Sequence, residues 1–179
     1  MHQLPYLCVQ VEYTFSCVVM NSSNAGFPFT VSLSAPSDPS AADTAAGFAY
    51  AFDCGDGAGY AAFGSSASAT CPTSDVGMRA VGALIRDKDG GVTEYRGTVS
   101  VGVTFDSLCA LVRSFARRTE DADALCAKLA DAAQAPTDGA KAGKLSAFRN
   151  QVDAKTGPEL GKSFTTDQGA LLKLLSTRL

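Results

Sequence analysis

Apolar and polar residues alternate along several short stretches in the first part of the chain. From Val9 to Cys17 every second residue is apolar, and the same period of two returns at Phe27–Leu33 and Phe48–Cys54. This period places alternate side chains on opposite faces, so each stretch predicts a half-buried β-strand. Residues 34–46 are rich in Ser, Pro, Ala and Asp and have no apolar period, which predicts a surface loop.

Two further strands are expected after a glycine-rich segment. Alternation at Val81, Ala83 and Ile85 predicts a strand that ends at Asp87, and residues 92–103 predict its partner. Between them, the segment Asp89-Gly90-Gly91 can supply the positive φ angles that a tight hairpin requires. Short strands separated by turn residues at this spacing predict an antiparallel all-β sandwich.

After Val103 the apolar period becomes that of an α-helix. Apolar residues between Phe105 and Phe115 recur at spacings of three and four. A second helix is expected over residues 122–134 and a third around residues 145–152, with an interruption at residues 136–139. The chain therefore predicts a small all-α module after its β-region.

A capping-box signal marks the last helix, because Thr165 is followed three residues later by Gln168. The expected module has three or four helices. We therefore predict an N-terminal segment at residues 1–25 that contributes a first strand, a β-sandwich at 26–103 and a helical module at 104–179.

Composition narrows the function classes. Of 179 residues, 46% are hydrophobic and 18% are charged, and the net charge is −3. The 15 Lys and Arg residues are scattered, which argues against a nucleic-acid partner. No stretch approaches the roughly 18 apolar residues of a membrane-spanning helix. Residues 1–20 lack a basic n-region, so if the protein is exported, its signal is expected outside this chain or the start is misplaced.

Six cysteines accompany a single histidine, His2. No Cys-x-x-Cys pair exists, so a zinc ribbon or a thioredoxin-type centre lacks its minimal spacing. We favour two disulfides over the alternative of buried free thiols, and an exported protein would permit them. The favoured pairs are Cys54 with Cys71 and Cys109 with Cys126, while Cys8 and Cys17 cannot pair along one continuous strand.

One segment resembles the PKD domain family. It runs Tyr50-Ala51-Phe52-Asp53-Cys54-Gly55-Asp56-Gly57, and Asp87-Lys88-Asp89-Gly90-Gly91 follows some thirty residues later. The resemblance covers Phe27–Val103 and implies an immunoglobulin-like sandwich that serves as a spacer or binds protein or carbohydrate. The sequence departs from the family at Phe52, Cys54 and Arg79, where Trp, Phe and Tyr are common.

The helical part is similar to the FIMAH-type domain, on the segments Phe105-Asp106-Ser107-Leu108-Cys109, Leu145-Ser146-Ala147-Phe148 and Ser163-Phe164-Thr165. The resemblance implies a module at the end of a bacterial extracellular protein. Residues 158–161 look like extra loop length.

Two weaker site hypotheses come from the turns of the β-region. Asp53, Asp56, Asp87 and Asp89 carry the oxygen ligands that Ca²⁺ prefers, but tight turns select the same residues. Tyr60 and Phe63 could stack on sugar rings if they are exposed, and the alternative is that they cover the core. No other metal and no cofactor is expected.

The expected function is non-catalytic. A Ser-His-Asp or Cys-His site would have to use His2 in the N-terminal tail, and nothing predicts paired carboxylates across a cleft. We expect a structural spacer and interaction region of a larger secreted or cell-surface bacterial protein, with protein or polysaccharide as partner. The alternative is a carbohydrate- or protein-binding accessory module of a secreted hydrolase.

Overall fold

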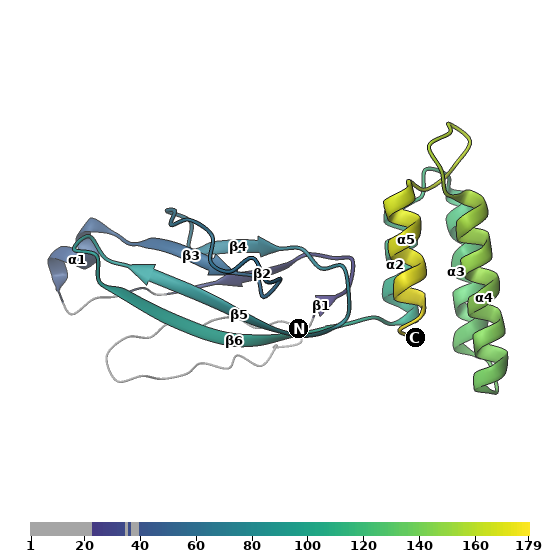
Figure 1. Cartoon of the computed structure of the whole chain (residues 1–179), viewed down its shortest axis with the longest axis horizontal. Helices are drawn as coiled ribbons and strands as arrows, with labels where there is room; N and C mark the ends of the chain where they lie inside the picture. Colours follow the sequence, from purple (N-terminus) through teal and green to yellow (C-terminus); the bar gives the residue numbers. More distant parts are fainter. Residues whose placement is uncertain (1–22, 35, 37–39) are drawn as a thin grey trace, which may run out of the picture. The chain divides into compact units, whose positions relative to one another are not determined.

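The computed structural model describes residues 23–34, 36 and 40–179. Within that part the chain forms two β-sheets and five α-helices (Figure 1). Contacts divide it into two compact units, which we call the β unit and the helical unit. The β unit contains Pro28–Thr73 and Gly77–Val101, and the helical unit contains Gly102–Leu179 with the short segments Asn24–Phe27 and Ser74–Val76. The boundary expected after residue 103 lies beside the division at Gly102.

The larger sheet has the strand order β1-β6-β5-β3. Its strands are β1 (Ser23–Asn24), β3 (Ala49–Asp53), β5 (Gly77–Arg86) and β6 (Val92–Gly102). Both β3 and β6 run antiparallel to β5. The odd residues from Val81 to Ile85 point to one face and are buried, so the even residues point to the other face, which we call the outer face.

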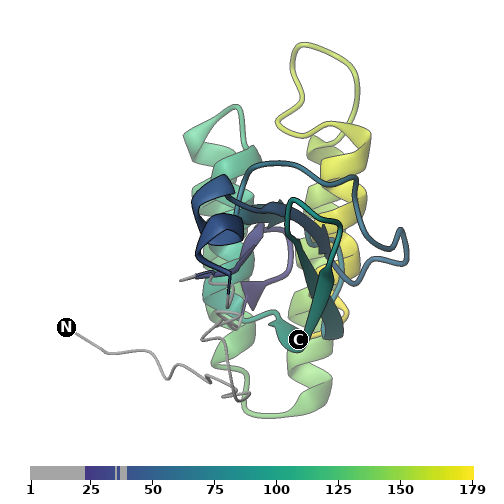
Figure 2. The same cartoon turned by 90° about the vertical axis from the view of Figure 1, so that its left-hand side faces the viewer.

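A second sheet pairs β2 (Phe29–Ser32) with β4 (Ser68–Cys71) in antiparallel register. Both strands are labelled in Figure 1, and Figure 2 shows the strands of the β unit nearly end-on. Strand β2 contacts β5, and β3 contacts β4, so the two sheets share one core. The buried apolar side chains of this core include Phe29, Val31, Leu33, Tyr50, Phe52, Cys71, Val81, Ala83, Ile85, Val99 and Val101.

One expectation for the β unit was wrong, and one of its strands was not predicted. Residues 34–46 were expected to be a loop, but Ala41–Ala46 forms helix α1, whose N-cap Ser40 accepts a hydrogen bond from the Asp43 amide. The signal was this cap, which precedes a run of helix-forming alanines without any apolar stripe. Strand β4 was not predicted, because its four residues, Ser-Ala-Thr-Cys, bury a single large side chain, that of Cys71.

Four antiparallel helices make up most of the helical unit: α2 (Phe105–Phe115), α3 (Thr119–Ala133), α4 (Asp138–Lys155) and α5 (Thr166–Ser176). Each contacts the next, and α5 contacts α2, so the helices form a closed bundle (Figure 1). Its fully buried side chains include Leu108, Leu111, Leu125, Leu129, Phe148, Val152, Phe164, Leu172 and Leu175. Among the described residues, no helix is long and apolar enough to cross a bilayer.

Capping boxes fix the starts of two of these helices. The predicted capping box at Thr165 and Gln168 is confirmed, because each side chain bonds the other residue's backbone amide. A second capping box, between Thr104 and Ser107, starts α2 and was not predicted. Each box satisfies amides that the first turn of a helix leaves without partners.

Some predictions fall outside the described residues. These are the strand at residues 9–17, the pairing state of Cys8 and Cys17, and the position of His2.

Candidate functional site

The Gly-Asp-Gly segment after β3 is a turn held by its own aspartates. Asp53 accepts a hydrogen bond from the Gly55 amide at 2.8 Å, and Asp56 accepts one from the Ala58 amide at 3.0 Å. Gly55 has φ +67°, and a Cβ there would lie 2.3 Å from the Ala80 carbonyl oxygen. Glycine is therefore required at Gly55 by both conformation and space.

The hairpin between β5 and β6 depends on Asp87. Its Oδ1 accepts hydrogen bonds from the amides of Asp89 at 2.9 Å and Gly91 at 2.8 Å. Positive φ was expected of both hairpin glycines, but only Gly90 adopts it, at +90°. The sequence analysis attributed this hairpin turn to the backbone freedom of its two glycines. In the structure, the side chain of one aspartate, Asp87, holds the turn closed.

The four aspartates considered for Ca²⁺ lie in two separate pairs. Asp53 pairs in register with Gly82 in the middle of β5, whereas Asp87 follows Arg86, the last residue of that strand. Gly82 and Arg86 are four positions apart along the strand, which corresponds to about 13 Å. Within the described part of the chain, no group of three or more His, Cys, Asp or Glu side chains could hold a metal ion. The turn hydrogen bonds account for Asp53, Asp56 and Asp87.

Tyr60 lies against the outer face of the larger sheet. A Cβ added to Gly82 would lie 2.1 Å from the Tyr60 hydroxyl, so the phenol crosses β5 where the sheet has no side chain. The hydroxyl donates a hydrogen bond to Glu94 on β6 at 2.6 Å, and Arg96 pairs with the same carboxylate at 2.7 Å. Tyr60 therefore links the glycine-rich segment to two strands.

Electrostatics at this position follow from the shared contacts. Burial of the ring, with the hydrogen bond to Glu94, raises the pKa of Tyr60 to about 12. The hydrogen bond from Tyr60 and the neighbouring Arg96 guanidinium lower the pKa of Glu94. At neutral pH the phenol is a neutral donor and the carboxylate is an ionised acceptor.

Phe63 also lies against the outer face of the larger sheet, next to Arg86 of β5. The Arg86 guanidinium lies 4.1 Å from the centre of its ring, which is a cation–π contact. Ala51 belongs to this face and is only 1% exposed, so the sheet is covered here. Tyr60 and Phe63 are half-buried. The structure therefore gives both aromatic residues a packing role against the sheet.

Among the residues that the structure describes, each unit contains one disulfide. Cys54 is bonded to Cys71, and Cys109 is bonded to Cys126, with Cα–Cα distances of 5.4 and 5.1 Å. These are the two pairs favoured from the sequence. The first disulfide joins the end of β3 to β4 and encloses the glycine-rich segment, and the second joins α2 to α3.

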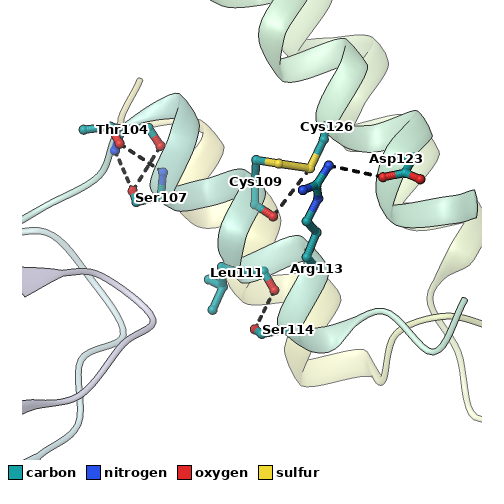
Figure 3. Close-up of a disulfide and its surroundings, with 8 residues drawn as sticks. All are labelled: Thr104, Ser107, Cys109, Leu111, Arg113, Ser114, Asp123 and Cys126. Carbon is teal, nitrogen blue, oxygen red and sulfur yellow. Dashed lines mark hydrogen bonds and ion pairs between the residues drawn. A yellow bond between two sulfur atoms is a disulfide. The ribbon is translucent and has the colours of Figure 1, made fainter. Parts of the chain in front are cut away.

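The second disulfide lines a groove between α2 and α3 with a volume of about 530 Å³. Arg113 and Asp123, also in the lining, pair across it at 3.2 Å (Figure 3). Asp106 adds a second carboxylate to the lining. The sequence pattern did not indicate this groove, because Arg113 and Asp123 lie on the polar faces of their helices and meet only through helix packing.

An ionic cluster around the buried Asp121 joins three segments of the helical unit. The Asp121 carboxylate pairs with Arg118 and Lys155, each at 2.7 Å, and accepts a hydrogen bond from the Ser163 hydroxyl. Its side chain is 5% exposed. Burial alone would raise the pKa of Asp121, but the hydrogen bonds from Lys155, Ser163 and Arg118 outweigh it and lower the pKa to about 2. Asp121 thus ties the start of α3 to the end of α4.

A cavity of about 570 Å³ lies at the hairpin end of the β unit and is lined by Phe48, Arg86 and Lys88 among others. The Lys88 ammonium pairs with Asp43 at 2.8 Å and with Asp89 at 2.6 Å. Lys88 therefore joins α1 to the hairpin, and its charge is already balanced by two carboxylates.

Comparisons with known proteins do not assign this chain to a family. No protein-family model matches the chain, and a search of curated proteins finds no match. Among solved structures, the fibronectin(III)-like modules of CbhA from Clostridium thermocellum are similar at 21% identity and a TM-score of 0.38, covering 49% of this chain and 43% of theirs. A quinonprotein alcohol dehydrogenase-like protein from Bacteroides thetaiotaomicron is similar at 12% identity and a TM-score of 0.30, covering 53% of this chain and 21% of that one. At these TM-scores neither similarity assigns a fold or a function.

Proposed function

We propose that this chain is a non-catalytic structural and spacer region of a larger extracellular bacterial protein. In this proposal the β unit is an immunoglobulin-like sandwich of the PKD type, and the helical unit is a FIMAH-type module. The observation that carries the proposal is that each compact unit contains its own disulfide. Such cross-links persist in oxidising, extracellular environments and stabilise small cores there.

The side chains considered for ligand binding support the spacer over the binding alternative. Tyr60 uses its hydroxyl on Glu94, and Phe63 lies against Arg86. Asp53 and Asp87 accept hydrogen bonds from their own turns. A polymer ligand would have to displace these internal contacts, whereas a spacer gains stability from them.

A spacer transmits force along its chain, so single-molecule pulling tests the proposal. Each disulfide has a sequence separation of 17 and prevents the enclosed residues from extending. Full reduction should lengthen each unfolding step by about 60 Å, at roughly 3.5 Å per residue. Equal step lengths in the oxidised and fully reduced chains would contradict the proposal.

Retention on insoluble polysaccharide separates the two functions. The spacer predicts that neither the wild-type chain nor Tyr60→Ala is retained on cellulose, chitin or xylan. Retention of the wild type that disappears in Tyr60→Ala, with the fold intact by circular dichroism, would favour the carbohydrate-binding accessory module.

A further inference from the structure

The two disulfides differ in the surroundings of their second cysteine, which is Cys71 in one bond and Cys126 in the other. Cys54 and Cys109 are both half-buried, so exposure of these residues does not distinguish the bonds. Their partners differ. Cys71 is 0% exposed and lies opposite Phe29 in the sheet core, whereas Cys126 is 9% exposed and lines the groove between α2 and α3.

The groove is charged where the disulfide lies. Arg113 follows Cys109 by four residues on α2, so the two are neighbours on the helix surface. The Arg113 guanidinium pairs with Asp123, three residues before Cys126 on α3 (Figure 3). The groove around this disulfide therefore contains one cation and the carboxylates of Asp106 and Asp123.

Thiol–disulfide exchange is sensitive to these surroundings. A thiolate attacks the accessible sulfur, and the other sulfur leaves as a thiolate, faster when its pKa is lower. A Cys126 thiolate would form in a groove that contains a guanidinium. A Cys71 thiolate would form in a dry core, where burial disfavours the charge.

We propose that Cys109 is a site of thiol–disulfide exchange with an external dithiol, under conditions in which the Cys54–Cys71 bond stays intact. The first thiolate of the dithiol attacks Cys109 Sγ, the bond to Cys126 Sγ breaks, and Cys126 leaves as a thiolate. The second thiolate then attacks the dithiol's own sulfur in the mixed disulfide and releases Cys109. The protein disulfide gains two electrons, the dithiol becomes a cyclic disulfide, and its two protons balance those taken up by the cysteine thiolates.

Timed reduction of the full-length chain by dithiothreitol, without denaturant, tests this proposal. Alkylation and peptide mapping report each cysteine separately. Cys109 and Cys126 should become alkylated together at least about 10-fold faster than Cys54 and Cys71. Their rate should rise linearly with dithiothreitol concentration, as direct attack requires. Equal rates for the two pairs, or a rate that levels off because the unit must first open, would overturn the proposal.

Charge variants test the role of the groove. Arg113→Gln removes the cation and should slow reduction of Cys109–Cys126 by about threefold, whereas Asp123→Asn removes a carboxylate and should speed it by a similar factor. Arg117→Gln, an exposed residue outside the groove lining, is the charge-matched control and should leave the rate unchanged. If Arg113→Gln and Asp123→Asn leave the reduction rate unchanged, or if Arg117→Gln changes it as much as they do, the charges of the groove do not control the reduction of Cys109–Cys126.

Discussion

The β unit and the helical unit are cross-linked alike but stabilised differently. Both disulfides have a sequence separation of 17. Among the described residues, however, the largest fully buried side chains of the β unit are Val31 and Val99, and the others lie in the helical unit. The same cross-link is therefore expected to be a larger part of the stability of the described β unit, which relies on turns and strand pairing around fewer fully buried side chains.

The largest expected effect is in the core of the helical unit. Phe148 is 0% exposed, and Phe148→Ala should destabilise this unit by about 4 kcal/mol through lost burial and a cavity. Far-ultraviolet circular dichroism follows the helices during urea unfolding. All five tyrosines of the sequence, Tyr6, Tyr13, Tyr50, Tyr60 and Tyr95, precede the segment that begins at Gly102, so tyrosine fluorescence does not report on the helix bundle and its transition should not move.

Leu160→Ala is the control for this truncation, because Leu160 is fully exposed, at 101%. It should leave both transitions in place. A common shift of both probes in Phe148→Ala would contradict the division into two units.

Removal of each disulfide tests the comparison itself. Replacing Cys54 and Cys71 together by Ala, or Cys109 and Cys126 together, should cost about 3 kcal/mol in the chain-entropy model, because the loops are equally long. Loss of a native disulfide often prevents a small domain from folding at about 37 °C. Without Cys54–Cys71 the β unit should therefore be partly unfolded at that temperature, whereas the helical unit should stay folded without Cys109–Cys126. Circular dichroism and tyrosine fluorescence measure the two outcomes. Unfolding of the helical unit but not of the β unit would contradict the view that the β unit depends more on its disulfide.

The glycine-rich turn offers a matched pair of substitutions. Gly55→Ala should destabilise the β unit by about 2 to 3 kcal/mol, because a positive φ is combined with a clash against the Ala80 carbonyl. Gly57 also has positive φ, at +90°, but nothing lies within 4 Å of its added Cβ, so Gly57→Ala should cost about 1 kcal/mol. Equal effects in urea unfolding would show that the close approach to Ala80 is unimportant.

Acid should weaken the helical unit through Asp121. Its folded-state pKa of about 2 lies below the ordinary value of 3.8. The stabilisation is therefore present above about pH 4 and is lost as the pH falls toward 2, a change of about 2 kcal/mol. Asp121→Asn should be less stable at neutral pH and should lack this part of the acid dependence. Parallel acid profiles for the two proteins would refute the role assigned to the cluster.

Local chemistry made much of the helical unit predictable from the sequence. The apolar stripe from Phe105 to Phe115 gave the bounds of α2, and Thr165 with Gln168 gave the start of α5. Such signals depend on neighbours in sequence, as helix hydrogen bonds do. The Asp121 cluster was missed because its members are brought together by packing, from residues 118 to 163.

The β unit was less predictable, since strand pairing joins distant residues. Strand β4 exists because Phe29 and Cys71 pair across 42 positions of sequence, with no periodic signal in Ser-Ala-Thr-Cys itself. The role of Tyr60 depends on Gly82 leaving space on the outer face. Composition marked Tyr60 as a ligand candidate, but only the fold shows what its ring covers.

Peptide mapping of the oxidised chain under non-reducing conditions tests the central claim most directly, that each unit is closed by its own disulfide. We predict one cross-linked pair that contains Cys54 and Cys71 and another that contains Cys109 and Cys126. A free thiol at any of these four residues, or a bond from one pair to the other, would contradict it.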